Sequence, residues 1–160
     1  MRVTLRQYLP ADSNETLELF RDTVHSVNAA DYSAEQLDAW APPSMNAALW
    51  NQRILRNDCA VVAEQQGTIV GIGTADTSGY FDLLYVHKDY QRMGIATSFA
   101  EYIEEYLSRH GVASITTEAS ITAVPFFENR GYVIRQEQKV ECRGQLFTNY
   151  KMEKEMGGVL

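Results

Sequence analysis

The residues best suited to bind a ligand lie in a short turn, residues 91–96, between an apolar run and an amphipathic stretch. Residues 81–86 are apolar, branched and aromatic, which predicts a buried strand. After the turn, apolar residues recur every three or four positions, which predicts a helix that ends near Gly111. Gly94 and Ala96 let a ligand approach the backbone, and the first amides of a helix have no partner of their own. We therefore predict a phosphate-binding turn, the alternative being a turn that only packs the helix.

A carboxylate also stands inside the predicted strand. Asp82 interrupts an apolar run, and a charge there needs either a partner or a role in proton transfer. Glu118, near the end of the next parallel strand and on the same side as Ser120, is the second candidate for a general base. For each, the alternative is an ion-paired or solvated carboxylate. Strand alternation predicts two faces, with Tyr80, Asp82 and Leu84 on one and Phe81, Leu83 and Tyr85 on the other.

The turn and its flanks resemble the coenzyme A loop of the GNAT superfamily of N-acetyltransferases. The family pattern is Gln or Arg, two free positions, Gly, one free position, and Gly or Ala; Gln91, Gly94 and Ala96 fill its slots. About thirty residues downstream, residues 123–132 resemble the family's short helix and following strand, Ala-x-x-Leu-Tyr-Glu-x-x-Gly-Phe. The resemblance is strongest from residue 80 to 132. Three further stretches look like the YafP-like branch of the superfamily, namely residues 32–36, 118–122 and 140–144.

The resemblance implies that acetyl-CoA is the donor and that attack on it is direct, with no covalent cysteine. The Val86 amide would polarise the thioester carbonyl, and Ser120, where the family often has an asparagine, would contact the pantetheine arm or else cap a helix. By similarity, the residues expected to bind the donor are Leu84, Tyr85, Val86, Gln91, Arg92, Met93, Gly94, Ile95, Ala96, Thr97, Ser120, Phe126 and Phe127.

The resemblance also suggests roles in proton transfer. Tyr80 occupies a position where some relatives carry a glutamate base. Many relatives have a tyrosine at the position of Phe127, whose hydroxyl protonates the leaving thiolate, and phenylalanine has no proton to donate. Tyr150 or Tyr132 could replace it, or the thiolate could leave unprotonated.

Specificity for the acceptor should come from the early helices and the last hairpin. There the polar and aromatic candidates for contact with the acceptor are His25, Tyr32 and Trp40, the alternative being that the aromatic side chains belong to the core. The sequence does not identify the amine.

The elements that must position these residues follow from hydrophobic periodicity. Helices are predicted near residues 12–28, 33–40 and 46–56, with Asp12 and Glu15 as a capping box for the first. Further strands are predicted at residues 3–8, 59–64, 68–74, 114–120, 132–141 and 145–153. The order predicts an α/β (α+β) fold, with one mixed, mostly antiparallel sheet of about seven strands, a central parallel crossover and flanking helices. This agrees with the GNAT fold that the resemblance implies.

Size and composition limit the remaining possibilities. The 160 residues suit one domain, residues 1–156, followed by a flexible tail, residues 157–160. A net charge of −7 argues against a nucleic-acid partner, and two cysteines with no clustered histidines predict no metal site. No apolar run approaches the roughly 20 residues of a membrane span, and residues 1–6 lack a signal-peptide core, which predicts a cytoplasmic protein.

We therefore predict an acetyl-CoA-dependent N-acetyltransferase acting on a small-molecule amine or a peptide. The alternative from another class is a catalytically silent acetyl-CoA-binding module that regulates a partner. The sequence does not decide between a monomer and a homodimer.

Overall fold

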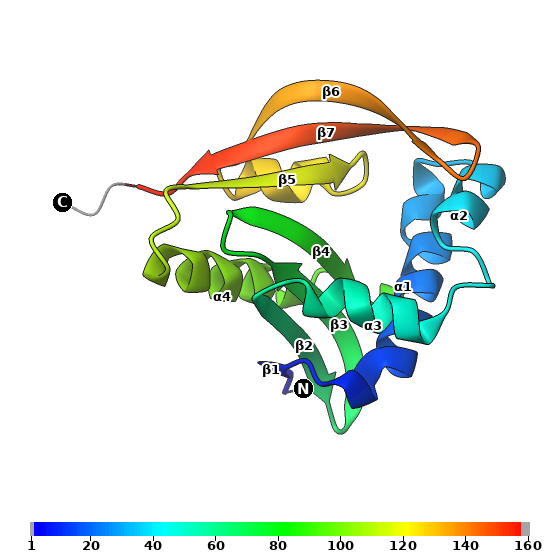
Figure 1. The fold of residues 1–160 in the computed structure, drawn as a ribbon, viewed down its shortest axis with the longest axis horizontal. Helices are drawn as coiled ribbons and strands as arrows, with labels where there is room; N and C mark the ends of the chain where they lie inside the picture. Colours follow the sequence, from blue (N-terminus) through cyan, green and yellow to red (C-terminus); the bar gives the residue numbers. More distant parts are fainter. Residues whose placement is uncertain (1, 158–160) are drawn as a thin grey trace.

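The computed structural model describes residues 2–157; residues 158–160, most of the predicted tail, lie outside the described part. Within it, seven strands form one sheet in the order β1-β2-β3-β4-β5-β7-β6 (Figure 1). Every pair is antiparallel except β4 with β5, which confirms the predicted mixed sheet with its central parallel crossover. The strands are β1 (Thr4–Gln7), β2 (Cys59–Gln65), β3 (Thr68–Ala75), β4 (Tyr80–Val86), β5 (Ser114–Ser120), β6 (Val133–Cys142) and β7 (Gln145–Glu155).

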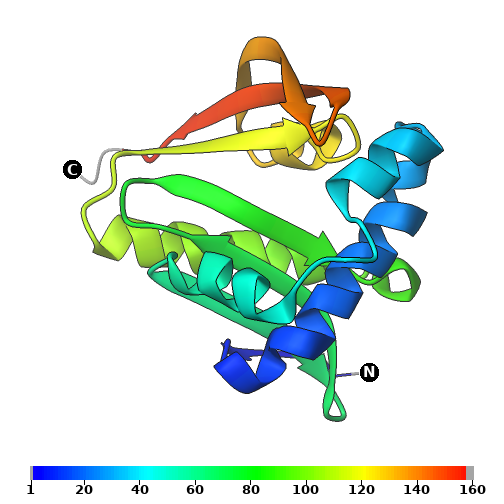
Figure 2. The same ribbon diagram turned by 45° about the vertical axis from the view of Figure 1, so that its right-hand side comes forward.

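Helices cover both faces of this sheet. Figures 1 and 2 show α3 and α4 on opposite faces. Buried residues of α1, α2 and α3 form one hydrophobic core with β2, β3 and β4, while α4 and α5 pack on the other face. The helices are α1 (Ser13–Ser26), α2 (Ala34–Trp40), α3 (Ala47–Leu55), α4 (Ile95–Arg109) and α5 (Val124–Asn129). No helix among residues 2–157 is long and apolar enough to cross a bilayer.

The predicted capping box at the start of α1 is wrong. Asp12 precedes the helix but makes no side-chain cap. Its carboxylate instead accepts hydrogen bonds from Arg6 Nη1 and Nη2 at 2.9 and 3.0 Å, and from the Leu9 amide at 2.8 Å. The Asp12 oxygens that would have capped α1 are therefore bonded to Arg6, which lies outside the helix.

Two glycines let α4 lie close to β3. A Cβ atom at Gly71 would stand 2.7 Å from Phe99 Cε2, and one at Gly73 would stand 2.9 Å from Phe99 Cδ1. Both glycines therefore leave room for the buried Phe99 ring. This close approach fixes α4, and hence the turn that precedes it, against the centre of the sheet.

A β-bulge interrupts β4 next to the predicted catalytic position. Thr74 pairs with Leu83, but the following Ala75 pairs with Phe81, so Asp82 is the extra residue. The Leu83 amide donates to the Thr74 side-chain hydroxyl at 3.2 Å, which replaces a regular ladder bond. A bulge bends its strand and increases the local twist.

The bulge changes which side chains share a face, so the predicted alternation of β4 is wrong. Phe81 and Leu84 pack on the α4 side, whereas Leu83 and Tyr85 pack with the core of α1 to α3. Asp82 also faces α3, because it is bound by side chains from that helix and its end. Asp82 therefore lies on the same face of the sheet as Leu83 and Tyr85, and not on the opposite face as predicted.

A buried carboxylate joins α4 to the carboxyl-terminal part of the chain. Glu104 accepts hydrogen bonds from Arg130 Nη2 and Lys154 Nζ, each at 2.9 Å, and from the Tyr132 hydroxyl at 3.0 Å. Burial alone would raise the pKa of Glu104, but the hydrogen bonds from Arg130 and Lys154 outweigh it and the net pKa is lowered. The folded state therefore stabilises the ionised form.

We expect Glu104→Gln to lower the free energy of unfolding by about 3 kcal/mol at pH 7, because two partly buried cations lose their counter-ion. The folded pKa lies below the unfolded value of about 4.3. The stabilisation is therefore complete above about pH 4.3 and disappears as the pH falls through the folded pKa. Urea unfolding of both proteins at several pH values tests this. A stability difference that persists undiminished at low pH would contradict the electrostatic explanation.

Candidate active site

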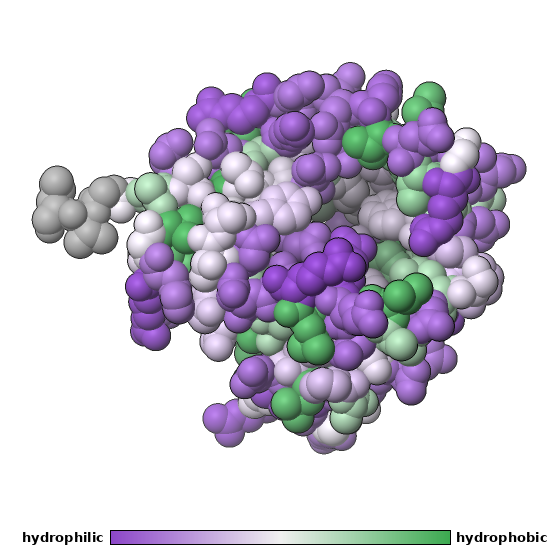
Figure 3. All heavy atoms as spheres, viewed as in Figure 1, coloured by the Kyte–Doolittle hydropathy of each residue, from purple (hydrophilic) through white to green (hydrophobic). Residues whose placement is uncertain are grey.

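A cleft opens where β4 and β5 stop pairing. Tyr80 pairs with Thr116 and Phe81 with Thr117, and no later residue of β4 pairs with β5. The last link is a hydrogen bond of 2.9 Å from the Thr117 hydroxyl to the Phe81 carbonyl. Beyond it lies a cleft of about 590 Å³, and Figure 3 shows a hollow on the face that carries α3. The bulge at Asp82 lies where the strands separate, and its extra twist turns β4 away from β5.

The predicted phosphate-binding turn forms one wall of this cleft. Gln91 Nε2 donates to the Val86 carbonyl at 2.5 Å, which ties the turn to the end of β4. Arg92 and Gly94 have φ angles of +61° and +82°. Gly94 is the N-cap of α4, and no side chain caps this helix. Its first amides and positive dipole end are therefore available to an anion.

There is also space for a ligand at this turn. A Cβ atom at Gly94 would meet nothing within 4 Å. Arg92 holds a left-handed conformation that costs about 1 kcal/mol or more for a residue with a side chain, and such strain clusters at ligand clamps. Together with the uncapped helix, these features fit the pyrophosphate of coenzyme A.

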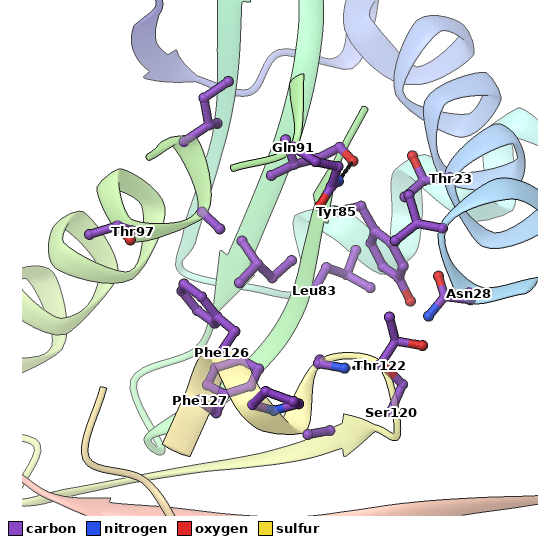
Figure 4. A pocket seen from close by; sticks show the side chains of 18 of the residues that line it. Thr23, Asn28, Leu83, Tyr85, Gln91, Thr97, Ser120, Thr122, Phe126 and Phe127 are labelled. Carbon is purple, nitrogen blue, oxygen red and sulfur yellow. Dashed lines mark hydrogen bonds between the residues drawn. The ribbon is translucent and has the colours of Figure 1, made fainter. Parts of the chain in front are cut away.

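Nearly all the residues predicted to bind the donor line this one cleft (Figure 4). The exception is Met93, which is exposed and lies instead in a smaller hollow beside Val3 and Leu5. Ser120 lines the cleft, and its hydroxyl also accepts the Ala123 amide at 3.2 Å, as in a helix cap. The lining set from the prediction is Leu84, Tyr85, Val86, Gln91, Arg92, Gly94, Ile95, Ala96, Thr97, Ser120, Phe126 and Phe127.

The two candidate carboxylates both line the cleft but have different surroundings. Asp82 Oδ1 accepts from Arg53 Nη2 at 3.1 Å, and Oδ2 accepts from Asn57 Nδ2 at 3.5 Å. Glu118 is exposed, and its Oε2 accepts from the neutral amide of Gln138 at 2.9 Å. Within residues 2–157, Glu118 forms no ion pair. Asp82 is thus the anchored carboxylate and Glu118 the freer one.

Tyr80 lies beside both carboxylates, although it is not part of the cleft lining. Burial, followed by the charges of Glu118 and Asp82, raises the pKa of Tyr80 to about 12. Its hydroxyl therefore keeps its proton at neutral pH. Asp82 and Glu118 line the cleft, and Tyr80 is close enough to both for their charges to act on its hydroxyl.

Neither tyrosine considered as a donor to the thiolate lines the cleft. The Tyr150 hydroxyl donates to Glu137 Oε1 at 3.0 Å, and that of Tyr132 donates to Glu104. Phe127 is buried and packs edge-on against Phe81, with ring centroids 5.5 Å apart. Phe127 thus supplies an apolar wall and no proton.

Of the predicted acceptor contacts, only Trp40 lines the cleft. The Tyr32 hydroxyl donates to the Thr148 carbonyl at 2.7 Å and accepts the Ile121 amide at 3.0 Å, so it ties the loop after α1 to the strands across the cleft. His25 Nε2 lies 2.9 Å from the Ala41 carbonyl, beside α2.

Thr23 and Asn28 line the cleft and were not predicted. Thr23 lies three positions after the buried Phe20, on a mostly apolar buried stripe of α1. A polar side chain on such a stripe is the signal that could have identified it. Arg53 and Asn57, which hold Asp82, were also missed, because only the folded chain brings α3 beside β4.

Comparison with known proteins agrees with this geometry. The family profile described as acetyltransferase (GNAT) domain matches residues 28–154. The uncharacterized N-acetyltransferase YafP of Escherichia coli (strain K12) is 31% identical over 153 residues, covering 94% of this chain and 94% of YafP. The crystal structure of a GCN5-related N-acetyltransferase from Rhodopseudomonas palustris superposes with a TM-score of 0.92 at 32% identity, covering 98% of this chain and 97% of that one.

More distant structures share the fold. The PaiA N-acetyltransferase of Thermoplasma acidophilum, solved in complex with coenzyme A, has a TM-score of 0.79 at 16% identity, covering 98% of this chain and all (100%) of that one. Other proteins of this fold were solved with acetyl-CoA. The profile covers most of the sequence, and two relatives exceed 30% identity over nearly their whole length. The resemblance seen in residues 91–96 and 123–132 is therefore confirmed, and the chain belongs to the GNAT family of N-acetyltransferases.

Proposed function

We propose that this chain transfers the acetyl group of acetyl-CoA, by direct attack, to the amine of a small molecule or a peptide. The single observation that carries the proposal is the cleft between β4 and β5. It joins the uncapped start of α4, on one face of the sheet, to Asp82 and Glu118 on the other. Such a cleft lets a donor and an acceptor meet inside the sheet.

The donor side can be described from the chain's own groups. The amides at the start of α4 would hold the pyrophosphate, and the backbone of β4 from Leu84 to Val86, which has no strand partner on the cleft side, would pair with the pantetheine arm. Phe126 and Phe127 add an apolar wall. When bound, acetyl-CoA supplies a thioester whose carbonyl carbon is the electrophile.

We propose Glu118 as the general base, acting directly or through one water. Its exposure to the cleft and its single neutral partner support this role. Asp82, the first candidate from sequence, has Arg53 and Asn57 on its oxygens, which supports a role as a fixed charge that anchors α3. As the C–N bond forms and the C–S bond breaks, the amine proton goes to Glu118. The leaving sulfur does not need a proton donor, because a thiol of pKa about 8.5 can leave as a thiolate. The two candidate tyrosines, whose hydroxyls are bonded elsewhere, are therefore not required.

A panel of amines, small peptides and aminoglycosides tests the proposal. Thiol release from acetyl-CoA is followed for each acceptor, and coenzyme A binding is titrated on the same preparation. We expect release that depends on the acceptor and a product heavier by one acetyl group. Tight donor binding with no turnover on any acceptor would instead support the catalytically silent module.

We further propose that residues 1–156 act as one domain, which the single sheet running from Thr4 to Glu155 supports. A cytoplasmic location is supported by the two free cysteines, Cys59 and Cys142, which suit a reducing compartment.

A further inference from the structure

Uncharged polar groups gather where the cleft meets the end of α1. Asn28 is only 5% exposed and lines the cleft, yet its side-chain amide forms no hydrogen bond with any residue from 2 to 157. The Thr23 hydroxyl is buried and also has no partner in this part of the chain. Figure 4 shows Thr23, Asn28 and Tyr85 on the same side of the cleft. Trp40 completes the group from α2.

Unpaired polar groups in a protein interior require an explanation. Most buried polar atoms have a hydrogen-bond partner, and a ligand or a water can complete one that lacks it, such as Thr23 Oγ1 beside the cleft. The polar atoms of the Asn28 amide are not among the fully buried unpaired ones of residues 2–157, so they are open to the cleft that the residue lines. Its amide, with one acceptor oxygen and two N–H donors, fits a ligand that both donates and accepts. Burial raises the pKa of Tyr85, so its hydroxyl keeps a proton to donate.

The charges that line the cleft disfavour one class of ligand. Among the described lining residues, Asp82 and Glu118 are the acidic ones, and Arg92 is the basic one. Arg92 belongs to the donor turn, and Arg53 is already paired with Asp82. Lys151, the register neighbour of Glu118 on β7, is not part of the lining. A carboxylate on the acceptor would therefore meet the charge of Glu118 and the neutralised Asp82–Arg53 pair, with no unpaired cation in the lining outside the donor turn.

Aromatic rings supply the rest of this wall. The ring centroids of Trp40 and Tyr85 lie 6.5 Å apart at an angle of 66°. Phe20 packs edge-on against Tyr85 at 5.0 Å and holds that ring in place. An apolar or aromatic body on the acceptor would fit beside them.

We infer that Thr23, Asn28, Trp40 and Tyr85 form the acceptor subsite of this enzyme. It takes a primary amine that carries an uncharged hydrogen-bonding group, a carboxamide or a hydroxyl, beside an apolar body, and it discriminates against the corresponding carboxylate. The inference rests on the proposed acetyl transfer and names its acceptor class.

Three matched amines test this class, because they share a phenyl ring and a primary amine and differ in one substituent. Phenylalaninamide has a carboxamide, phenylalanine a carboxylate, and 2-phenylethylamine neither. We expect kcat/KM for phenylalaninamide to exceed that for phenylalanine by about 100-fold or more, since the carboxylate meets the like charge of Glu118 and leaves buried polar groups unpaired. Against 2-phenylethylamine the advantage should be about tenfold, the value of one or two hydrogen bonds.

Variants of the protein separate recognition by the subsite from the intrinsic chemical reactivity of each amine, because that reactivity is the same whichever variant is used. Asn28→Leu, close in size, should reduce the ratio of kcat/KM for phenylalaninamide over 2-phenylethylamine by about tenfold. Thr23→Val should reduce it less. Asn14→Leu, at an exposed position of α1, makes the same substitution away from the cleft; it is the matched control and should leave the ratio as in the original protein. Because an unpaired amide is replaced by an apolar group, the Tm of Asn28→Leu should be unchanged or higher, which loss of a structural residue would not produce.

Two results would overturn the inference while acetyl transfer itself stands. One is phenylalanine acetylated as efficiently as phenylalaninamide, and the other is the same ratio in Asn28→Leu as in the original protein. If coenzyme A binds but no amine of any kind is acetylated, the proposed function fails and this inference fails with it.

Discussion

Gly94→Glu is expected to weaken coenzyme A binding by more than about 100-fold while the fold persists, because a carboxylate would face the phosphates of the donor. Gly94 is the uncapped N-cap of α4, and a side chain built there points into open space. That space is where we expect the pyrophosphate, so the new charge would repel it and fill its site. Calorimetric titration with coenzyme A, together with a melting curve, measures both effects.

Gly94→Ala is the matched control for backbone strain. The φ angle of +82° disfavours any side chain, so both variants lose about 1–2 kcal/mol of stability. Only Gly94→Glu adds charge and length, and the difference in affinity between the two variants isolates that contribution. Equal affinity of both variants for coenzyme A would refute the placement of the pyrophosphate.

The second large effect is expected from Glu118→Gln, which should lower kcat by about 10²–10⁴-fold, the range for loss of a general base. Glutamine keeps the shape and the hydrogen bond from Gln138 but does not accept the amine proton. The residual rate should rise with pH as free amine accumulates without help from the protein. Steady-state kinetics across pH at saturating acetyl-CoA give this profile, and donor affinity should not change.

Asp82→Asn is the counterpart that distinguishes an anchor from a base. It breaks the pair with Arg53, whose side chain is 43% exposed and so remains hydrated. The expected loss is therefore about 1–2 kcal/mol of stability, less than for a fully buried pair. Its effect on kcat should be smaller than that of Glu118→Gln. A larger loss of kcat in Asp82→Asn with an unchanged Tm would reverse the two assignments.

The donor half of the site could be predicted because its residues are neighbours in sequence. Gln91, Gly94 and Ala96 occupy one turn, and the apolar periodicities before and after it indicate a strand and a helix without reference to distant contacts. Local spacing thus indicated both the elements and the position of the uncapped amides at the start of α4.

The acceptor half depends on contacts between distant segments. Thr23, Asn28 and Trp40 reach the cleft only because α1 and α2 pack beside β4. Tyr32 was a candidate for acceptor contact because a tyrosine can hydrogen-bond a ligand. In the folded chain its hydroxyl is hydrogen-bonded to backbone groups of residues 121 and 148. Residue type alone does not distinguish these two outcomes.

The position of Asp82 was mispredicted in detail for a related reason. Alternation assumes a regular strand, whereas β4 has a bulge, beside which the Leu83 amide donates to the hydroxyl of Thr74 on the neighbouring strand. The capping box at Asp12 failed similarly, because Arg6 competes for its oxygens. Both errors come from a side chain that local patterns do not include.

The separation of β4 from β5 has a consequence for the order of events in turnover. The cleft is lined from both faces of the sheet, by the turn before α4 on one and by the end of α1 on the other. A donor seated against α4 thus leaves the approach beside α1 open. Neither reactant has to depart before the other arrives, so both can be present together. Initial-rate plots against one reactant at fixed levels of the other should then intersect, as they do for a ternary complex.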